Sequence, residues 1–212
     1  MTEIVLYDYW RSSASYRVRI ALQTLGLAYE SVPIDLLASA HKDPSYLKIN
    51  PQGLVPSLRI DGRTLTQSLA IIEYLAETRP EGRFLPDTAA GRQRVRALSY
   101  AVAMDIHPIC NLHVVSHVAR LAGKESARKE WMIKFIGSGL HALEQMLDDP
   151  AAGRFCFGDT PTMADFCLVP QVYNARRWGI EMSPFPRVAR ICDACNALPA
   201  FKAAHPDVAK PA

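Results

Sequence analysis

The segment Arg11–Arg17 (Arg-Ser-Ser-Ala-Ser-Tyr-Arg) places three serines and two arginines between a predicted strand and a predicted helix. Unpaired backbone N–H groups and the helix dipole both favour an anion at a helix N-terminus. A serine hydroxyl in this position can hydrogen-bond a thiolate or another anion, and so lower the pKa of a thiol. Serine is also a common N-cap, and on its own the segment favours simple capping.

Val55-Pro56 and Gln67-Ser68 are two further places where the chain could meet a ligand. Only about 5–6% of X-Pro bonds in folded proteins are cis, so the Val55–Pro56 bond is expected to be trans. A cis bond there would turn the backbone groups of Val55 toward a bound peptide. Gln67-Ser68 stands where a predicted strand meets a helix, and a carboxylate could meet backbone donors at that point. Taken singly, Gln67-Ser68 is explained by capping.

The segment Asp105–Pro108 (Asp-Ile-His-Pro) lies within a long helical pattern. Its proline removes one helical hydrogen bond, and a bend beside His107 indicates the wall of a cleft. A histidine in a kinked helix is nevertheless more often structural than catalytic. His113 and His117 have the i, i+4 spacing of zinc ligands. No third and fourth ligands of matching type accompany them, so we predict no metal site.

Three arginines and a cysteine pair are weaker candidates. Arg11, Arg176 and Arg177 could neutralise a substrate carboxylate, because arginine can donate two parallel hydrogen bonds to it. Cys192 and Cys195 have CxxC spacing, but they lie in a late helical pattern. A redox pair of the thioredoxin type belongs after a first strand, so we interpret this spacing as incidental.

The first part of the chain predicts the elements that would position these residues. Residues 4–9 are β-branched and aromatic, as in a strand, and residues 18–25 have apolar side chains at helical spacing before Gly26. Residues 29–34 predict a second strand, residues 55–66 a hairpin around Asp61-Gly62, and residues 68–78 a helix. The predicted order is β-α-β followed by β-β-α.

Residues 80–87 have the composition of a linker, and the part beyond them is helical throughout. Helical patterns cover residues 89–120, 126–147, 161–177, 187–197 and 199–204. Thr162 and Asp165 have capping-box spacing at the start of the third pattern. We therefore predict two domains, an α/β domain at residues 1–82 and an all-α domain at residues 88–212.

The composition excludes several classes of function. The 212 residues are 49% hydrophobic and 21% charged, which indicates a folded chain rather than a disordered one. A net charge of +3 is too small to indicate binding to nucleic acid or to a membrane surface. Apolar runs fall short of the roughly 18 residues of a membrane span, and no secretory signal is visible.

Charge and cysteine content complete this interpretation. Residues 1–82 hold 8 Lys and Arg against 9 Asp and Glu, whereas residues 83–212 hold 16 against 12. The excess of positive charge therefore lies in the predicted helical domain. The five cysteines are an odd number, and they indicate reduced thiols in a cytoplasmic protein.

Placed in chain order, the motifs resemble those of one family. The segments that carry the resemblance are RSSASYRVRIAL (11–22), NPQGLVP (50–56), QSLAIIEYL (67–75), DIHP (105–108) and GDTPT (158–162). They are similar to the motifs of the zeta-class glutathione transferases, the maleylacetoacetate and maleylpyruvate isomerases. The similarity extends from the first strand to at least Arg177.

The resemblance implies the glutathione transferase architecture, in which a thioredoxin-like N-terminal domain precedes an all-helical C-terminal domain. It also implies that the protein is a homodimer. It also implies a glutathione site between the domains. Ser12, Ser13 and Ser15 match the catalytic segment at the glutathione sulfur, with Ser12 as the expected partner of the thiolate. The other residues that match the glutathione site are Tyr16, Arg17, His41, Val55, Gln67, Ser68, His107, Asn111, Leu112 and His113.

Individual roles follow from the same resemblance. The main chain of Val55 would pair with the cysteinyl unit of glutathione, and Gln67 with Ser68 would hold the γ-glutamyl carboxylate. Arg11 and Arg177 match arginines that maleylpyruvate-handling members place near substrate carboxylates.

The family chemistry is the cis–trans isomerisation of a maleyl diketo acid. A thiolate adds to the cis double bond, the resulting single bond rotates, and elimination gives the fumaryl product. Members that act on maleylacetoacetate usually read Ser-Ser-Cys, whereas the third residue here is Ala14. The working sulfur belongs to glutathione, so this change should not abolish the reaction. The motifs leave open whether the substrate is maleylacetoacetate or maleylpyruvate.

Two other functions remain open. One is a general glutathione transferase or peroxidase acting on halogenated acids or peroxides, which a hydrophobic second pocket would favour. The other is a non-catalytic protein of this fold that acts through partners. Intact Ser12, Val55-Pro56 and Gln67-Ser68 argue against a decayed site.

Overall fold

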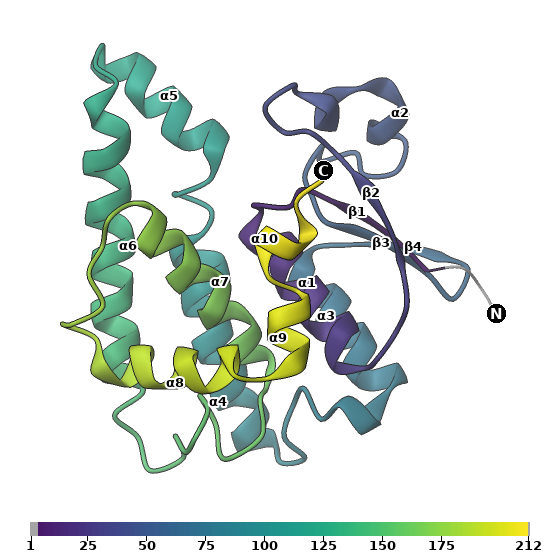
Figure 1. The fold of residues 1–212 in the computed structure, drawn as a ribbon, viewed down its shortest axis with the longest axis vertical. Helices are drawn as coiled ribbons and strands as arrows, with labels where there is room; N and C mark the ends of the chain where they lie inside the picture. The colour runs from purple at the N-terminus through teal and green to yellow at the C-terminus, as the bar shows by residue number, and fades with distance from the viewer. Residues whose placement is uncertain (1–3, 212) are drawn as a thin grey trace. The chain divides into compact units, whose positions relative to one another are not determined.

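The computed structural model describes residues 4–211, and the chain divides into two units (Figure 1). The first unit comprises the described residues up to Phe84 together with those from Ala197 onward, and the second unit is Leu85–Asn196. The predicted helical domain at 88–212 therefore differs from the structure at its end, because the last helices group with the first unit.

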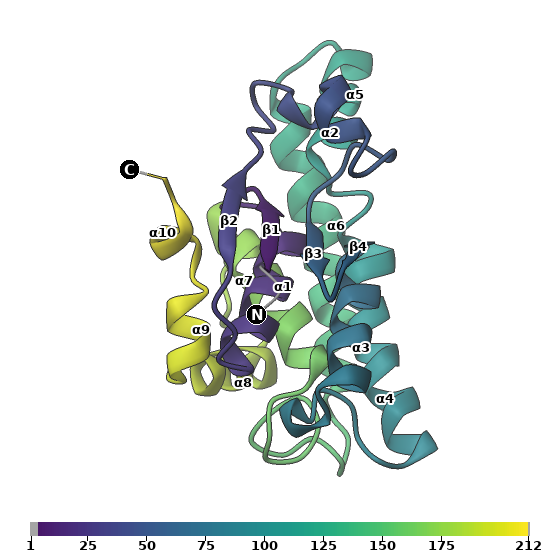
Figure 2. The ribbon, with the colours of Figure 1, turned by 90° about the vertical axis from the view of Figure 1, so that its right-hand side faces the viewer.

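The first unit is built on a four-stranded sheet, which Figure 2 shows face-on. Its elements are β1 (Val5–Asp8), α1 (Ser13–Thr24), β2 (Glu30–Pro33), η1 (Ala40–Lys42), α2 (Pro44–Leu47), β3 (Ser57–Ile60), β4 (Arg63–Thr66), α3 (Ser68–Thr78), η2 (Pro80–Gly82), α9 (Pro199–Ala203) and α10 (Pro206–Ala209). The strand order is β2-β1-β3-β4, in which β1 and β2 are parallel and the other two pairs are antiparallel. Helices α1 and α3 pack together on one face of this sheet (Figures 1 and 2).

One edge of the sheet gathers the segments predicted to carry chemistry. Tyr7 pairs with Val32 on one side and with Ser57 on the other, and Ser57 pairs with Thr66. The chain therefore leaves β1, β2 and β4, and enters β3, at the same edge, which we call the carboxyl edge. The start of α1, the Val55-Pro56 segment and the start of α3 all adjoin it.

Helix α1 is buried on every side over its first ten residues, including two arginines. Arg19 is 1% exposed, and its Nη1 lies 2.8 and 2.7 Å from the two carboxylate oxygens of Asp8. Its Nη2 donates to the carbonyl of Trp10 at 2.9 Å, and its Nε donates to the carbonyl of Ala204 at 3.0 Å. A buried charge is tolerated when it is paired and its donors are satisfied, as they are here. Arg19 thus joins β1, the segment after β1 and the C-terminal segment.

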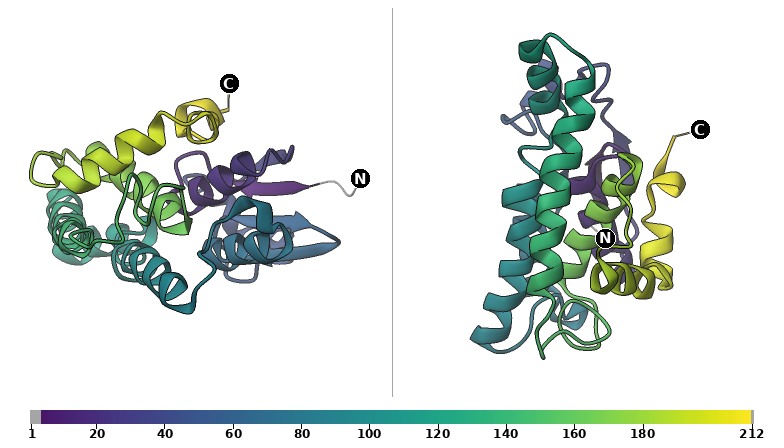
Figure 3. Two further views of the ribbon diagram at one scale, coloured as in Figure 1. Left: turned by 90° about the horizontal axis from the view of Figure 1, so that it is seen from below. Right: turned by 90° about the vertical axis from the view of Figure 1, so that its left-hand side faces the viewer.

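The second unit is entirely helical, and α5 and α6 form a hairpin within it (Figures 1 and 3). Its elements are α4 (Ala89–Tyr100), the π-helical η3 (Ala101–Ile106), α5 (Leu112–Ala122), α6 (Ser126–Met146), α7 (Met163–Arg177) and α8 (Pro186–Asn196). None of the helices in residues 4–211 is long and apolar enough to cross a membrane.

The predicted helix at 89–120 is wrong as one continuous element. The helix widens into a π-helical turn, in which the N–H of His107 donates to the carbonyl of Val102, and the chain then turns before α5 begins. Pro108 explains the break, because a proline has no N–H to continue the helical ladder. The indole N–H of Trp131 donates to the carbonyl of Ile109 at 2.9 Å, within the broken region.

The remaining helical predictions of the second unit are confirmed, including the capping box of α7. One carboxylate oxygen of Asp165 accepts from the N–H of Thr162 at 2.7 Å, and the other accepts from the N–H of Cys156 at 2.8 Å. Asp165 is fully buried, so these donors replace its lost hydration.

We expect Arg19→Met to lower the free energy of unfolding by about 3–5 kcal/mol, because it leaves the Asp8 carboxylate buried without a partner. The double variant Arg19→Met/Asp8→Leu should lose less, since it removes both charges. Urea denaturation followed by circular dichroism measures each value. Arg63→Met, at an exposed position in β4, is the matched control. A loss below about 1 kcal/mol for Arg19→Met would contradict a central role for the ion pair.

Candidate active site

Ser12 is the N-cap of α1 at the carboxyl edge. Its Oγ accepts a hydrogen bond from the N–H of Ser15 at 3.2 Å. A hydroxyl that accepts through a lone pair still has its own proton to donate. Capping therefore orients the Ser12 hydroxyl and leaves its O–H able to bind an anion, so the two predicted roles of this serine are compatible.

The three predicted catalytic serines differ in accessibility. Ser13 is 8% exposed and Ser15 is fully buried, whereas Ser12 is half-buried. Of the three, Ser12 presents the most surface to a ligand.

Tyr16 and Arg17 lie inside the first unit instead of facing a ligand. Tyr16 is 1% exposed, and its ring meets that of His205 edge-on at 6.1 Å between centroids. Arg17 is 2% exposed, and its Nη1 donates to the hydroxyl of Ser68 at 3.2 Å. The predicted contacts of both residues with glutathione would therefore be indirect. Arg17 holds the first residue of α3.

The Val55–Pro56 bond is cis, so the trans expectation is wrong. The segment before it is held by the hydroxyl of Tyr46 and the amide of Asn50, which donate to the carbonyl of Leu54 at 2.7 and 2.8 Å. Within residues 4–211, neither the N–H nor the C=O of Val55 forms a hydrogen bond. Val55 thus has a donor and an acceptor that a peptide ligand could pair with.

The start of α3 is a second place where main-chain groups are left for a ligand, because no N-cap side chain bonds to the first N–H groups of this helix. Gln67 precedes the helix with φ +66° and ψ 110°, and its side chain does not cap the helix. Its Nε2 instead donates to Oε1 of Gln52 at 2.8 Å. The capping explanation for Gln67 is therefore wrong. The first N–H groups of an uncapped helix suit a carboxylate, and backbone outliers of this kind concentrate at functional sites.

His41 belongs to η1, which contacts the loop before Val55. Gly53 adopts φ +59°, and a Cβ on it would lie 2.8 Å from the carbonyl oxygen of His41. The ammonium of Lys42 donates to the Gly53 carbonyl at 3.4 Å. The structure thus brings His41 near the loop that precedes Val55. Two residues predicted to bind the same ligand need to lie close together in this way.

The second unit holds the other predicted residues. His107 and Asn111 lie in the turn between η3 and α5, where Asn111 is the N-cap without using its side chain to cap. Leu112 and His113 are exposed in the first turn of α5. Arg177 is exposed at the C-terminal end of α7, where a cation also suits the helix dipole.

Arg11 lies in the first unit, directly after β1. Its Nη2 donates to the hydroxyl of Tyr9 at 2.9 Å, and its guanidinium carbon lies 4.9 Å from the centroid of the Trp10 ring. No acidic side chain in residues 4–211 forms an ion pair with Arg11, so its charge is available to an anion.

The cysteines are poor nucleophiles in this fold. All five are buried and none forms a disulfide. Burial raises the pKa of the Cys110 thiol to about 11, and it also raises the pKa values of Cys156, Cys192 and Cys195. Only a thiolate is a strong nucleophile, so these four side chains are inert at neutral pH.

Comparison with known proteins decides the family. Residues 2–77 match the model of the glutathione S-transferase N-terminal domain, and residues 129–194 match that of the C-terminal domain. The maleylacetoacetate isomerase of Rhizobium meliloti (strain 1021) is 66% identical over 210 residues, covering 99% of both chains. The chain belongs to the glutathione S-transferase family.

Solved structures agree with this membership. The holo structure of a bacterial maleylpyruvate isomerase, a zeta-class glutathione S-transferase, has a TM-score of 0.94 and 43% identity, covering 98% of both chains. The maleylacetoacetate isomerase of Anaeromyxobacter dehalogenans 2CP-1, with bound dicarboxyethyl glutathione and citrate, has a TM-score of 0.87 and 44% identity. That comparison covers 99% of this chain and 96% of the other. The predicted resemblance to zeta-class glutathione transferases is confirmed, as is the predicted fold class.

Several residues that support the site of this glutathione transferase carry no assigned role in the sequence analysis. Tyr46 and Asn50 fix the Leu54 carbonyl, and Gln52 fixes Gln67. Asn50 and Gln52 lie in the turn-forming NPQG motif, which is a signal for a loop but not for these contacts. Tyr46 lies in a helix of four residues, too short for a periodic pattern.

We expect Gly53→Ala to raise the KM for glutathione roughly tenfold or more with a smaller effect on kcat, because its Cβ would displace η1 and the loop before Val55. Steady-state kinetics at varied glutathione measures this. Gly26→Ala is the matched control, since Gly26 has φ +64° with nothing within 4 Å of an added Cβ. Equal KM values for the two variants would show that the loop does not position the site.

Proposed function

We propose that this chain is a glutathione-dependent isomerase that converts maleylacetoacetate, or the related maleylpyruvate, to its fumaryl isomer. The observation that carries the proposal is the Ser12 hydroxyl at the start of α1, oriented by its bond to the Ser15 N–H with its own proton free to donate. The 66% identity to a maleylacetoacetate isomerase supports the same substrate class.

The first unit has groups that fit glutathione. The unpaired N–H and C=O of Val55 suit the cysteinyl amide, and the uncapped start of α3 at Gln67 and Ser68 suits the γ-glutamyl carboxylate. His41 adjoins the same loop. We assign further contacts with glutathione to His107, Asn111, Leu112 and His113.

Ser12 has one task in this proposal, which is to hold a thiolate. Glutathione, when bound, supplies the sulfur that adds to the cis double bond and leaves after the bond has rotated. A hydrogen bond donated by Ser12, together with the α1 N-terminus, lowers the pKa of that thiol. Ser13 and Ser15 act through the geometry of the first turn, because they are buried. Having alanine at position 14 leaves the Ser12 hydroxyl in place, so the hydrogen-bond donor that this task needs is still present.

Arg11 and Arg177 are the proposed partners of the substrate carboxylates. Arg11 has no acidic partner in the part of the chain that the structure describes, and Arg177 is exposed. The Anaeromyxobacter isomerase binds citrate, a small polycarboxylate, which supports a polyanionic substrate for this chain. Guanidinium groups suit such a substrate because they pair with carboxylates in a fixed geometry.

We also propose a cytoplasmic homodimer with an N-terminal glutathione-binding domain at residues 1–82. Tyr100 and Met104, on α4 and η3 of the second unit, are 36% and 61% exposed. Large apolar side chains on one helical stretch suit an interface between two copies.

The assay is direct. Purified protein with glutathione should convert maleylacetoacetate or maleylpyruvate, followed as loss of the cis isomer by absorbance, and omission of glutathione should abolish the conversion. Failure to turn over either substrate would contradict the isomerase assignment. Conjugation of a halogenated acid without isomerisation would favour a general transferase, and failure to be retained on immobilised glutathione would favour a partner-binding protein.

We expect Ser12→Ala and Ser12→Gly to lower kcat/KM equally, by roughly 10–100-fold, because both remove a hydrogen bond to a charged group. The pKa of the bound thiol, read from thiolate absorbance against pH, should rise in both. Glycine replaces serine at an N-cap at little cost to the helix, whereas alanine does not. A loss of activity in Ser12→Ala but not in Ser12→Gly would therefore show that the effect comes from helix stability. Ser12→Thr keeps a hydroxyl and should retain activity.

A further inference from the structure

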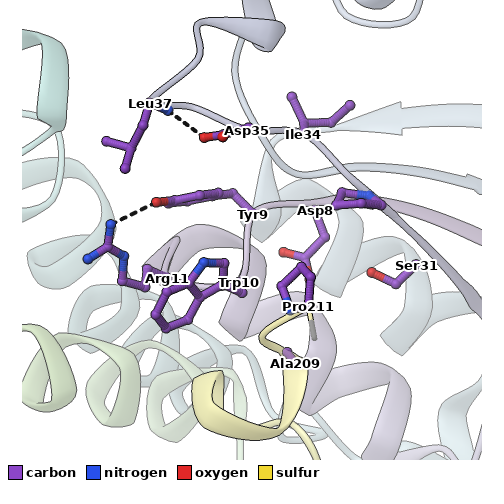
Figure 4. Close-up of a pocket in the computed structure, with 11 residues that line it drawn as sticks. Asp8, Tyr9, Trp10, Arg11, Ser31, Ile34, Asp35, Leu37, Ala209 and Pro211 are labelled. Atoms are coloured by element: carbon purple, nitrogen blue, oxygen red, sulfur yellow. Dashed lines mark hydrogen bonds between the residues drawn. The ribbon is translucent and has the colours of Figure 1, made fainter.

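The first unit contains a cavity at the carboxyl edge, on the side of β1 away from β3 and β4. We call it the β2-edge cavity, and its volume is about 570 Å³ (Figure 4). Its lining residues are Asp8, Tyr9, Trp10, Arg11, Ser31, Pro33, Ile34, Asp35, Leu37, Ala209 and Pro211. Ligand pockets commonly measure about 300–1,000 Å³, so this cavity can hold a small molecule.

The walls of the β2-edge cavity are mainly apolar and aromatic. Tyr9 and Trp10 come from the segment after β1, Ile34 and Leu37 from the segment after β2, and Ala209 from α10 (Figure 4). Leu37 is 64% exposed, so this part of the wall is open to solvent. Such walls suit a planar hydrocarbon body, because aromatic rings stack on flat apolar groups.

The two carboxylates that line the cavity differ in how they are held. Asp8 is neutralised by the buried guanidinium of Arg19. Oδ1 of Asp35 accepts from the N–H of Leu37 at 2.8 Å, and it also accepts from the N–H of Ala38. Asp8 is therefore charge-compensated, whereas Asp35 is an exposed carboxylate held by main-chain donors and keeps its charge in contact with solvent.

The cations beside the cavity have no acidic partner. The guanidinium of Arg11 lies against the Trp10 and Tyr9 rings, with centroid distances of 4.9 and 5.8 Å. The ammonium of Lys210 lies 5.5 Å from the centroid of the same Trp10 ring. Within residues 4–211 neither cation forms an ion pair, so two positive charges meet at one aromatic wall.

We propose that the β2-edge cavity binds an aromatic carboxylate, with its ring against Trp10 and its anionic group at Arg11 and Lys210. The main-chain groups that suit the peptide and the γ-glutamyl carboxylate of glutathione, at Val55 and the start of α3, lie on the β3 and β4 side of β1, whereas the cavity lies on its β2 side. Arg11 is common to this cavity and to the proposed substrate contact. The occupant therefore competes with the dicarboxylate substrate and leaves glutathione binding unchanged, a consequence that rests on the proposed function.

Isothermal titration calorimetry with 2-naphthoate tests the site without turnover. We expect one site per chain, and binding of the neutral analogue naphthalene-2-carboxamide at least about tenfold weaker, because it lacks the anionic group. Lys210→Met should weaken 2-naphthoate binding roughly twofold to fivefold. Lys202→Met is the matched control, since Lys202 is an exposed lysine of the same C-terminal segment without a contact to Trp10, and it should bind like the parent protein.

Three results would overturn the proposal: no saturable heat with 2-naphthoate, equal affinity for the carboxamide, or displacement of 2-naphthoate by glutathione. Ala209→Trp adds an independent check, because a large side chain at the wall should abolish binding of 2-naphthoate. The variant protein should unfold at the same temperature as the parent protein. In the isomerase assay, 2-naphthoate should raise the apparent KM for the maleyl substrate and leave the KM for glutathione unchanged. Binding without isomerase activity would contradict only the proposed function, and activity without binding would contradict only this site.

Discussion

Asp8 and Arg19 form a buried ion pair next to the segment that carries Ser12. Removing two charges from water is costly, and the cost is offset only if every strong donor and acceptor is satisfied. Arg19 meets this condition by donating to the Asp8 carboxylate, the Trp10 carbonyl and the Ala204 carbonyl. The same bonds fix where the chain goes after β1, and so where α1 begins. Arg19, which is buried, thus helps to fix the position of the Ser12 hydroxyl.

The parallel β1–β2 pair gives the carboxyl edge two sides with different chemistry. On the β3 and β4 side, the available groups are main-chain atoms of Val55 and the uncapped start of α3, which suit a peptide. On the β2 side, the available groups are aromatic rings and two cations, which suit a flat anion. The C-terminal segment, which groups with the first unit, completes the second side. A chain ending at Asn196 would lack both Ala209 and Lys210.

Local patterns predicted most of the fold, because the relevant forces act over a few residues. The helix at 68–78 and the capping box at Thr162 and Asp165 depend on neighbours along the chain, and both are confirmed. The contacts that complete the site join distant residues, such as Arg17 with Ser68. Arginine in an amphipathic pattern indicates an exposed side, and only the packed fold shows that α1 is buried all round. The grouping of residues 197–211 with the first unit could not be predicted for the same reason.

The low reactivity of the cysteine thiols also follows from the packing of the chain. A protein thiol that serves as a nucleophile needs a lowered pKa and access to its substrate, and burial works against both. Cys110, Cys156, Cys192 and Cys195 are buried with raised pKa values, and the residue two positions after Ser12 is Ala14. The Ser12 hydroxyl at the start of α1 therefore has no accessible protein thiol beside it in the described part of the chain. In the proposed mechanism, Ser12 donates to the sulfur of an incoming thiol, and in the part of the chain that the structure describes no accessible protein thiol competes for that hydrogen bond.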